Sequence, residues 1–121
     1  MDISKFQDIN AIRAIRWHNN GQTQWTLLEW AGAMCGESGE AANVAKKIRR
    51  LNQGLPNKEA GLSKNNLPEL KQKLAVEIAD SIIYGLIILA EIDVDASRIL
   101  AEVFDQKSIE YGFPERAPFN E

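Results

Sequence analysis

The chain has 121 residues, of which 45% are hydrophobic and 26% are charged, and its formal net charge is -3 at pH 7. These values are typical of one ordinary globular domain, so we predict a single domain over residues 1–121 and exclude a low-complexity or disordered chain. The acidic balance argues against a general binder of nucleic acid or of anionic membranes.

The single cysteine and the single histidine limit the chemistry further. Cys35 cannot form an internal disulfide, and His18 alone cannot supply a histidine-rich metal site. The amino terminus lacks the apolar region of a signal peptide, and the longest apolar run, residues 82–90, is too short to span a bilayer. We therefore expect a soluble protein of the reducing cytoplasm without a membrane partner.

The first half of the chain contains two segments with a helical pattern. A capping-box spacing between Thr26 and Glu29 predicts that the second segment begins at Thr26 and runs to residue 51. Residues 19–25, rich in polar residues and containing a glycine, should form the loop before it. The first segment, residues 3–17, carries apolar residues at every third position along one stripe: Ile3, Phe6, Ile9, Ile12 and Ile15.

Two further helices are predicted after a long connection. Residues 52–66 contain two glycines, a proline and four asparagines without a helical period, so we predict a connecting loop over residues 51–67. Pro68 suits the first turn of the third helix, whose later part, apolar nearly all round, should be the most buried helix of the protein. Its apolar residues recur every four positions: Leu70, Leu74, Ile78, Ile82 and Leu86.

The end of the chain supplies the last helix and sets the fold class. Asp95 is a suitable N-cap for a fourth helix, and residues 112–121 should form an irregular C-terminal tail because they contain a glycine and two prolines. No segment alternates as a strand would, so we predict an all-α bundle of four main helices. The apolar stripe of the fourth helix is Ile99, Leu100, Val103 and Phe104.

Two pairs of acids stand at helical spacing among apolar residues. Glu37 and Glu40 share one face of the second helix, and Glu77 and Asp80 share one face of the third. Carboxylates near a core repel one another and raise one another's pKa, and a divalent cation removes this conflict. We therefore predict that all four ligate Mg²⁺, a cation that prefers oxygen ligands. Ordinary solvated helix faces are the alternative interpretation.

Glycines accompany the first acid pair. Gly36 and Gly39 each cost about 1 kcal/mol relative to alanine inside a helix. A close approach of another helix or of a ligand would justify that cost.

The segments GESGEAANVAKKIRR and LAVEIADSIIYGLIILAEIDVD, taken together, resemble the MazG-like all-α nucleoside triphosphate pyrophosphohydrolases over residues 25–114. The shared pattern is ExxE on one helix and ExxD on the next. The resemblance implies hydrolysis of a (d)NTP between its α and β phosphates, dependent on Mg²⁺ or on Mn²⁺ in its place. It also implies a homo-oligomer, either a dimer or a tetramer.

One segment departs from the family pattern. Family members often carry Lys, Phe and Asn where this chain has Val103, Phe104 and Asp105 before GFP, so a lysine expected to contact phosphate is missing there. Lys107 is the neighbouring basic residue, but on a helix it faces another direction.

Several residues are candidates for roles in such a reaction. Glu37 or Glu40 would also orient the attacking water, which makes both catalytic candidates. Lys47 is the first candidate for a phosphate contact and Arg50 the second, although basic residues at a helix C-terminus also complement the helix dipole. Tyr84 is either a phosphate or carboxylate donor or a core residue, and Trp25 could stack on a base.

Two hypotheses from other classes compete with the enzyme. A non-catalytic interaction or regulatory module would bind nucleotide or nucleic acid through the basic residues Lys46 to Arg50, although the net acidity argues against a stable nucleic-acid partner. A purely structural bundle predicts that Glu40→Gln or Asp80→Asn stabilises the fold without catalytic loss. The enzyme, with a role in nucleotide-pool control or sanitation, predicts lost turnover and lost Mg²⁺ binding from the same changes.

Overall fold

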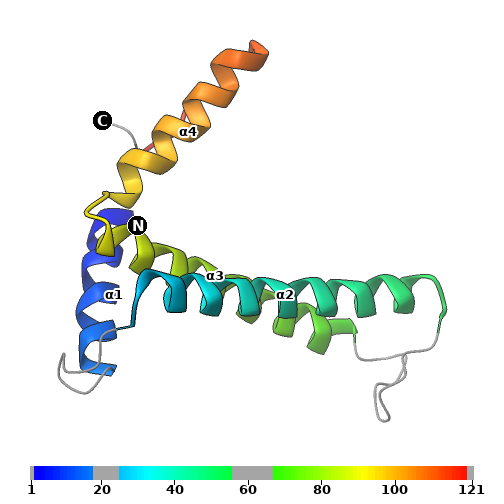
Figure 1. The fold of residues 1–121 in the computed structure, drawn as a ribbon. Helices are drawn as coiled ribbons and strands as arrows, with labels where there is room; N and C mark the ends of the chain where they lie inside the picture. Colours follow the sequence, from blue (N-terminus) through cyan, green and yellow to red (C-terminus); the bar gives the residue numbers. More distant parts are fainter. Residues whose placement is uncertain (1, 18–24, 56–66, 120–121) are drawn as a thin grey trace. The chain divides into compact units, whose positions relative to one another are not determined.

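The computed structural model describes residues 2–17, 25–55 and 67–119. Within these ranges the chain forms four α-helices and no strand, which confirms the predicted all-α class (Figure 1). None of these helices is both long enough and apolar enough to cross a lipid bilayer. The helices are α1 (Ile3–Trp17), α2 (Leu27–Asn52), α3 (Leu67–Glu91) and α4 (Ala96–Tyr111), each within one residue of its predicted start or end where one was given.

The chain divides into two compact units. The first unit comprises Met1–Leu27 and Gly85–Glu121, and so contains α1, the end of α3 and α4. The second unit, Leu28–Tyr84, contains α2 and the first part of α3, which lie side by side and run in opposite directions (Figure 1). We call the described part of this second unit, residues 28–55 and 67–84, the hairpin. A single bundle of all four helices stays a prediction.

A buried glutamine of α1 holds the first unit together. Gln7 is 4% exposed, and its side-chain amide donates to the carbonyl oxygen of Val94 at 2.8 Å. Its Oε1 accepts a hydrogen bond from the backbone N–H of Ala96 at 2.9 Å. Ala96 is the first residue of α4, where the helix leaves its backbone N–H groups without intrahelical partners. One side chain of α1 thus satisfies two backbone groups of the α3–α4 connection.

Both ends of α4 are fixed by the residues that the sequence indicates. Asp95 is the N-cap, with φ -72° and ψ 124°, and its side chain accepts a hydrogen bond from the backbone N–H of Arg98 at 3.0 Å. The hydroxyl of Ser4 in α1 also donates to Asp95. Gly112 ends the helix with φ 74°, a left-handed conformation that glycine adopts without steric cost. Residues 113–119 form no further helix, which agrees with the predicted tail.

The apolar stripes predicted for α1 and α4 are not the buried faces of these helices. Ile9, Ile12 and Ile15 are each more than half exposed, whereas Gln7 and Asn10 are the buried residues of α1. The apolar pattern marks a face, but the helix instead buries the face whose polar groups can pair with backbone atoms. In α4, similarly, the stripe residues Leu100, Val103 and Phe104 are about half exposed, and the buried residues are Ala96, Ala101 and Ser108.

Helix α3 follows its prediction in one part and departs from it in another. No residue from 83 to 90 is exposed, and Leu86 and Ile87 are buried, which agrees with the burial expected for the later part of this helix. Ile78 and Ile82, in contrast, are about half exposed. A four-residue step turns about 40° beyond a full helical turn, so a line of residues at this spacing rotates off any one face.

Candidate metal centre

Matched pairs of residues define how α2 and α3 face each other in the hairpin. The rings of Trp30 and Tyr84 have centroids 6.0 Å apart. Seven residues later in α2 and seven earlier in α3, Glu37 and Glu77 have carboxylate oxygens within 4.8 Å of each other. A further step of seven reaches Val44 and Leu70, which are 1% and 4% exposed. Seven residues are close to two helical turns, so these pairs mark the line along which the antiparallel helices meet. We call this line the seam.

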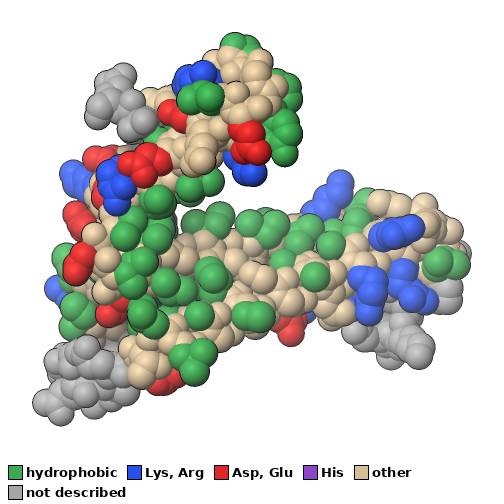
Figure 2. Space-filling view, turned by 45° about the horizontal axis from the view of Figure 1, so that its top comes forward, with side chains coloured by type: hydrophobic (Ala, Val, Ile, Leu, Met, Phe, Trp, Pro, Cys, Tyr) green, Lys and Arg blue, Asp and Glu red, His purple; other side chains and the backbone are tan. Residues whose placement is uncertain are grey.

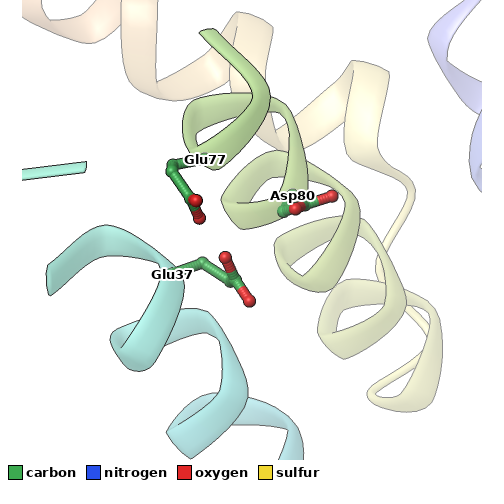
Figure 3. Close-up of side chains that lie close together, drawn as sticks. All are labelled: Glu37, Glu77 and Asp80. Carbon is green, nitrogen blue, oxygen red and sulfur yellow. The ribbon is translucent and has the colours of Figure 1, made fainter. Parts of the chain in front are cut away.

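The middle of the seam holds carboxylates where its outer positions are aromatic or aliphatic. Glu37 of α2 and Glu77 of α3 point toward each other, and Asp80 follows on α3 (Figure 3). One carboxylate oxygen from each of the three lies within 4.8 Å of the other two, and all three residues are half-buried. We call these three residues the acid cluster. The prediction that the two helices bring their acids together is therefore met for these three.

Electrostatic repulsion within the acid cluster is visible at Glu37. Its hydrogen bond with Glu77, together with partial desolvation and the negative charges of Glu77, Asp80 and Glu40, raises the pKa of Glu37 to about 7. A hydrogen bond between two carboxyl groups needs a proton on one of them, because ionised carboxylates only accept. Among the described residues, no lysine or arginine forms an ion pair with the cluster.

Glu40 lies outside the acid cluster. It is exposed, one turn further along α2 than Glu37, and its carboxylate is not among the three that approach one another. It acts on Glu37 through its charge, which contributes to the raised pKa of that residue. Its role as a fourth ligand stays a prediction.

The close approach expected at Gly36 and Gly39 does not occur among the described residues. A Cβ atom added at either position would meet no heavy atom within 4 Å. The helix therefore carries two glycines, each costing about 1 kcal/mol relative to alanine, without a contact inside the described chain that requires them. The surface of α2 beside Glu37 is open at these positions.

The predicted substrate-binding residues lie at different places. Tyr84 is half-buried and packs against Trp30 in the seam, seven residues after Glu77 of the acid cluster. Lys47 and Arg50 are half-buried on α2 beyond Val44. Trp25, also half-buried, precedes α2 and belongs to the first unit, whereas the acid cluster belongs to the second.

The other residues singled out in the sequence have local roles or none in the site. Lys107 pairs with Glu110 at 3.6 Å on the exposed surface of α4. Asp105 accepts a hydrogen bond from the backbone N–H of Ala117 at 2.7 Å and so holds the C-terminal tail. Cys35 is an exposed free thiol. His18 lies outside the described residues.

Two features next to the acid cluster were not predicted. The hydroxyl of Ser38 donates to the Ser81 hydroxyl across the seam at 3.2 Å, and that of Ser81 donates to the carbonyl oxygen of Glu77 at 3.0 Å. Lys73 precedes Glu77 by four residues and so shares its face of α3. That four-residue spacing could have identified Lys73 in the sequence, whereas the serine pair required the register of the two helices.

The donor set of the acid cluster fits Mg²⁺. This ion takes oxygen ligands at about 2.0–2.1 Å and usually keeps several water or phosphate ligands besides one or two carboxylates. The three residues bring carboxylate oxygens within 4.8 Å of one another, which are ligands of this kind. Comparisons of the chain with protein family models, with curated proteins and with solved structures gave no match.

Proposed function

We propose that this protein is a Mg²⁺-dependent nucleoside triphosphate pyrophosphohydrolase, which cleaves a (d)NTP between its α and β phosphates. The observation that carries the proposal is the acid cluster, where three half-buried carboxylates meet in the seam without a basic partner among the described residues. Such an arrangement disfavours folding unless a cation completes it. The products would be a (d)NMP and pyrophosphate, and we propose a role in nucleotide-pool control or sanitation in the cytoplasm.

The residues of the hairpin would have different roles in this reaction. A Mg²⁺ ion at the cluster would supply positive charge that offsets the charge of the triphosphate and makes the phosphorus more electrophilic. Glu37, Glu77 and Asp80 hold this charge in place. Glu40, exposed and outside the cluster, is the better placed of the two catalytic candidates to accept a hydrogen bond from the attacking water. The water oxygen bonds to phosphorus, the bridging P–O bond breaks, and the proton passes to the carboxylate.

We further propose that the protein is a homo-oligomer, a dimer or a tetramer, formed by helix packing. The support is the number of large apolar side chains that stay exposed on the helices of a single chain, among them Ile12 of α1, Ile78 and Ile82 of α3, and Phe104 of α4. Large apolar side chains that stay exposed on a helix are available for packing against another subunit. Open glycine positions on α2 would also allow a second copy to approach closely.

A binding module is the second candidate, and one observation favours it. Lys and Arg side chains gather at the end of the hairpin where α2 ends and α3 begins (Figure 2). These residues could bind the phosphates of a nucleotide without any turnover. A module of this kind would not need the acid cluster.

The deciding experiment presents ordinary and damaged nucleoside triphosphates with Mg²⁺ and measures pyrophosphate and orthophosphate separately. We expect pyrophosphate and the monophosphate in equal amounts from at least one substrate, and no release without a divalent cation. Nucleotide binding without pyrophosphate from any member of the panel would overturn the enzyme and favour the module.

A further inference from the structure

The hairpin is divided into an acidic half and a basic half. Residues 28–44 and 74–84 contain five acids and no basic residue, whereas residues 45–55 and 67–73 contain six basic residues and one acid, Glu69. The acid cluster lies in the acidic half, toward the border. The six basic residues are Lys46, Lys47, Arg49, Arg50, Lys71 and Lys73.

Lys73 is the basic residue of α3 that shares a face with the cluster. An α-helix turns about 100° and rises about 1.5 Å per residue, so Lys73 lies about 6 Å along the axis from Glu77. Lys73 and Asp80 are seven residues apart and point within about 20° of each other. Lys71 is exposed like Lys73 but points about 160° away from it, to the far side of the helix.

The seam has two sides, and Lys73 lies on the side that Asp80 and Glu40 share. Each helix has a residue that faces its partner directly, and other residues are rotated about the helix axis away from that residue. In an antiparallel pair, two residues rotated in the same sense, each viewed along its own helix from the N-terminus, lie on the same side of the seam. Asp80 follows Glu77, and Glu40 follows Glu37, by the same three residues, so both lie on one side. The hydrogen bond between Ser38 and Ser81, which are displaced in the other sense, marks the opposite side.

We propose that Lys73 binds the β and γ phosphates of the substrate, so that the triphosphate extends from the acid cluster toward the basic half of the hairpin. This inference rests on the proposed function. In the other direction along the seam, beside the pair Trp30 and Tyr84, the only charged residue of the hairpin outside the cluster is an acid, Glu29, so nothing basic there would attract a polyanionic tail. Pyrophosphate gains negative charge as it leaves, and a lysine one turn from Glu77 is placed to stabilise it.

The variants Lys73→Gln and Lys71→Gln test the inference as a matched pair, since each removes one exposed positive charge from the same turn of α3. A hydrogen bond to a charged group contributes about 1.5–3 kcal/mol, so Lys73→Gln should lower kcat/KM about 10-fold or more. Lys71→Gln should stay within about twofold of the wild type, because exposed charges away from a site are screened. Lys73→Arg, which keeps the charge, should retain most of the activity.

Binding of inorganic pyrophosphate with Mg²⁺, measured by calorimetry, gives a readout that needs no turnover. A loss of affinity in Lys73→Gln alone supports the inference, even if the wild type releases no pyrophosphate and the proposed function fails. Equal affinity in Lys73→Gln and Lys71→Gln overturns the inference, even if the wild type is an active pyrophosphohydrolase.

Discussion

Gln7 in the first unit and Glu37 in the second both place a polar side chain against a neighbouring helix, and their surroundings differ. The amide of Gln7 has a backbone partner for both its donor and its acceptor side. Glu37 faces two other acids, and their proximity contributes to the raised pKa of Glu37. Polar groups that are satisfied within the chain stabilise a fold, whereas uncompensated like charges need a partner from outside. The polar groups around Gln7 are thus paired within the chain, whereas the acid cluster of the hairpin is where we propose a cation.

The largest effect that separates the two regions is expected from Glu77→Gln. This change removes one of the three carboxylates that would hold the cation of the proposed site, and it also relieves repulsion within the cluster. The metal contributes several kcal/mol to the transition state, so pyrophosphate release should fall about 100-fold or more. The free energy of unfolding without Mg²⁺ should stay equal or rise. Glu69→Gln, an exposed acid earlier on α3, serves as the control, and equal activity of the two variants would remove the acid cluster from the site.

Gln7→Leu should lower the free energy of unfolding, in contrast to Glu77→Gln. It leaves the carbonyl oxygen of Val94 and the backbone N–H of Ala96 without their side-chain partner. An unsatisfied buried polar group costs about 1–3 kcal/mol, and the free energy of unfolding measured in urea should fall by at least that amount. Gln106→Leu, on the exposed surface of α4, should change it by less than about 0.5 kcal/mol. A similar small change in both variants would show that the first unit does not depend on this glutamine.

The smallest effect concerns how the stability of the fold decreases at low pH. The hydrogen bond from Ser4, followed by that from the backbone N–H of Arg98, lowers the pKa of Asp95 below its usual value. A lowered pKa in the folded state gives stability that is complete above the unfolded pKa and is lost as pH falls through the folded pKa.

Asp95→Asn should therefore lower the unfolding temperature at neutral pH and reduce its fall between about pH 5 and pH 2. The control is Asp93→Asn, because asparagine also tolerates the positive φ of 59° that Asp93 adopts. A decrease of stability at low pH that is unchanged in Asp95→Asn would contradict the assigned role of the N-cap.

Helix positions could be predicted from the sequence because their signals are local. Asp95, Gly112 and Pro68 act on the backbone within a few residues of themselves, and each lies where the sequence places it. The buried faces could not be predicted in the same way, because burial depends on which surface a helix meets. The three-residue stripe of α1 marks its apolar side, yet Gln7 is buried since backbone groups at the start of α4 need partners.

The candidate site could be predicted only in part, because it also depends on which surfaces the helices bring together. The spacing of Glu77 and Asp80 puts both on one face of α3, and the structure adds Glu37 from α2. Glu40 shares the spacing but stays outside the cluster, because the register of the seam sets Glu37 opposite Glu77. Register arises from packing between helices and has no signal in either helix alone.

The most direct test compares thermal unfolding, with and without Mg²⁺, of the wild type and of the variant Glu37→Gln, Glu77→Gln, Asp80→Asn. Because a ligand that binds only the folded state stabilises it, we predict that Mg²⁺ raises the unfolding temperature of the wild type. The variant should be the more stable protein without Mg²⁺ and should not respond to the ion. A wild type that is indifferent to Mg²⁺, or a variant that responds to it equally, would contradict the proposal that the acid cluster is a metal centre.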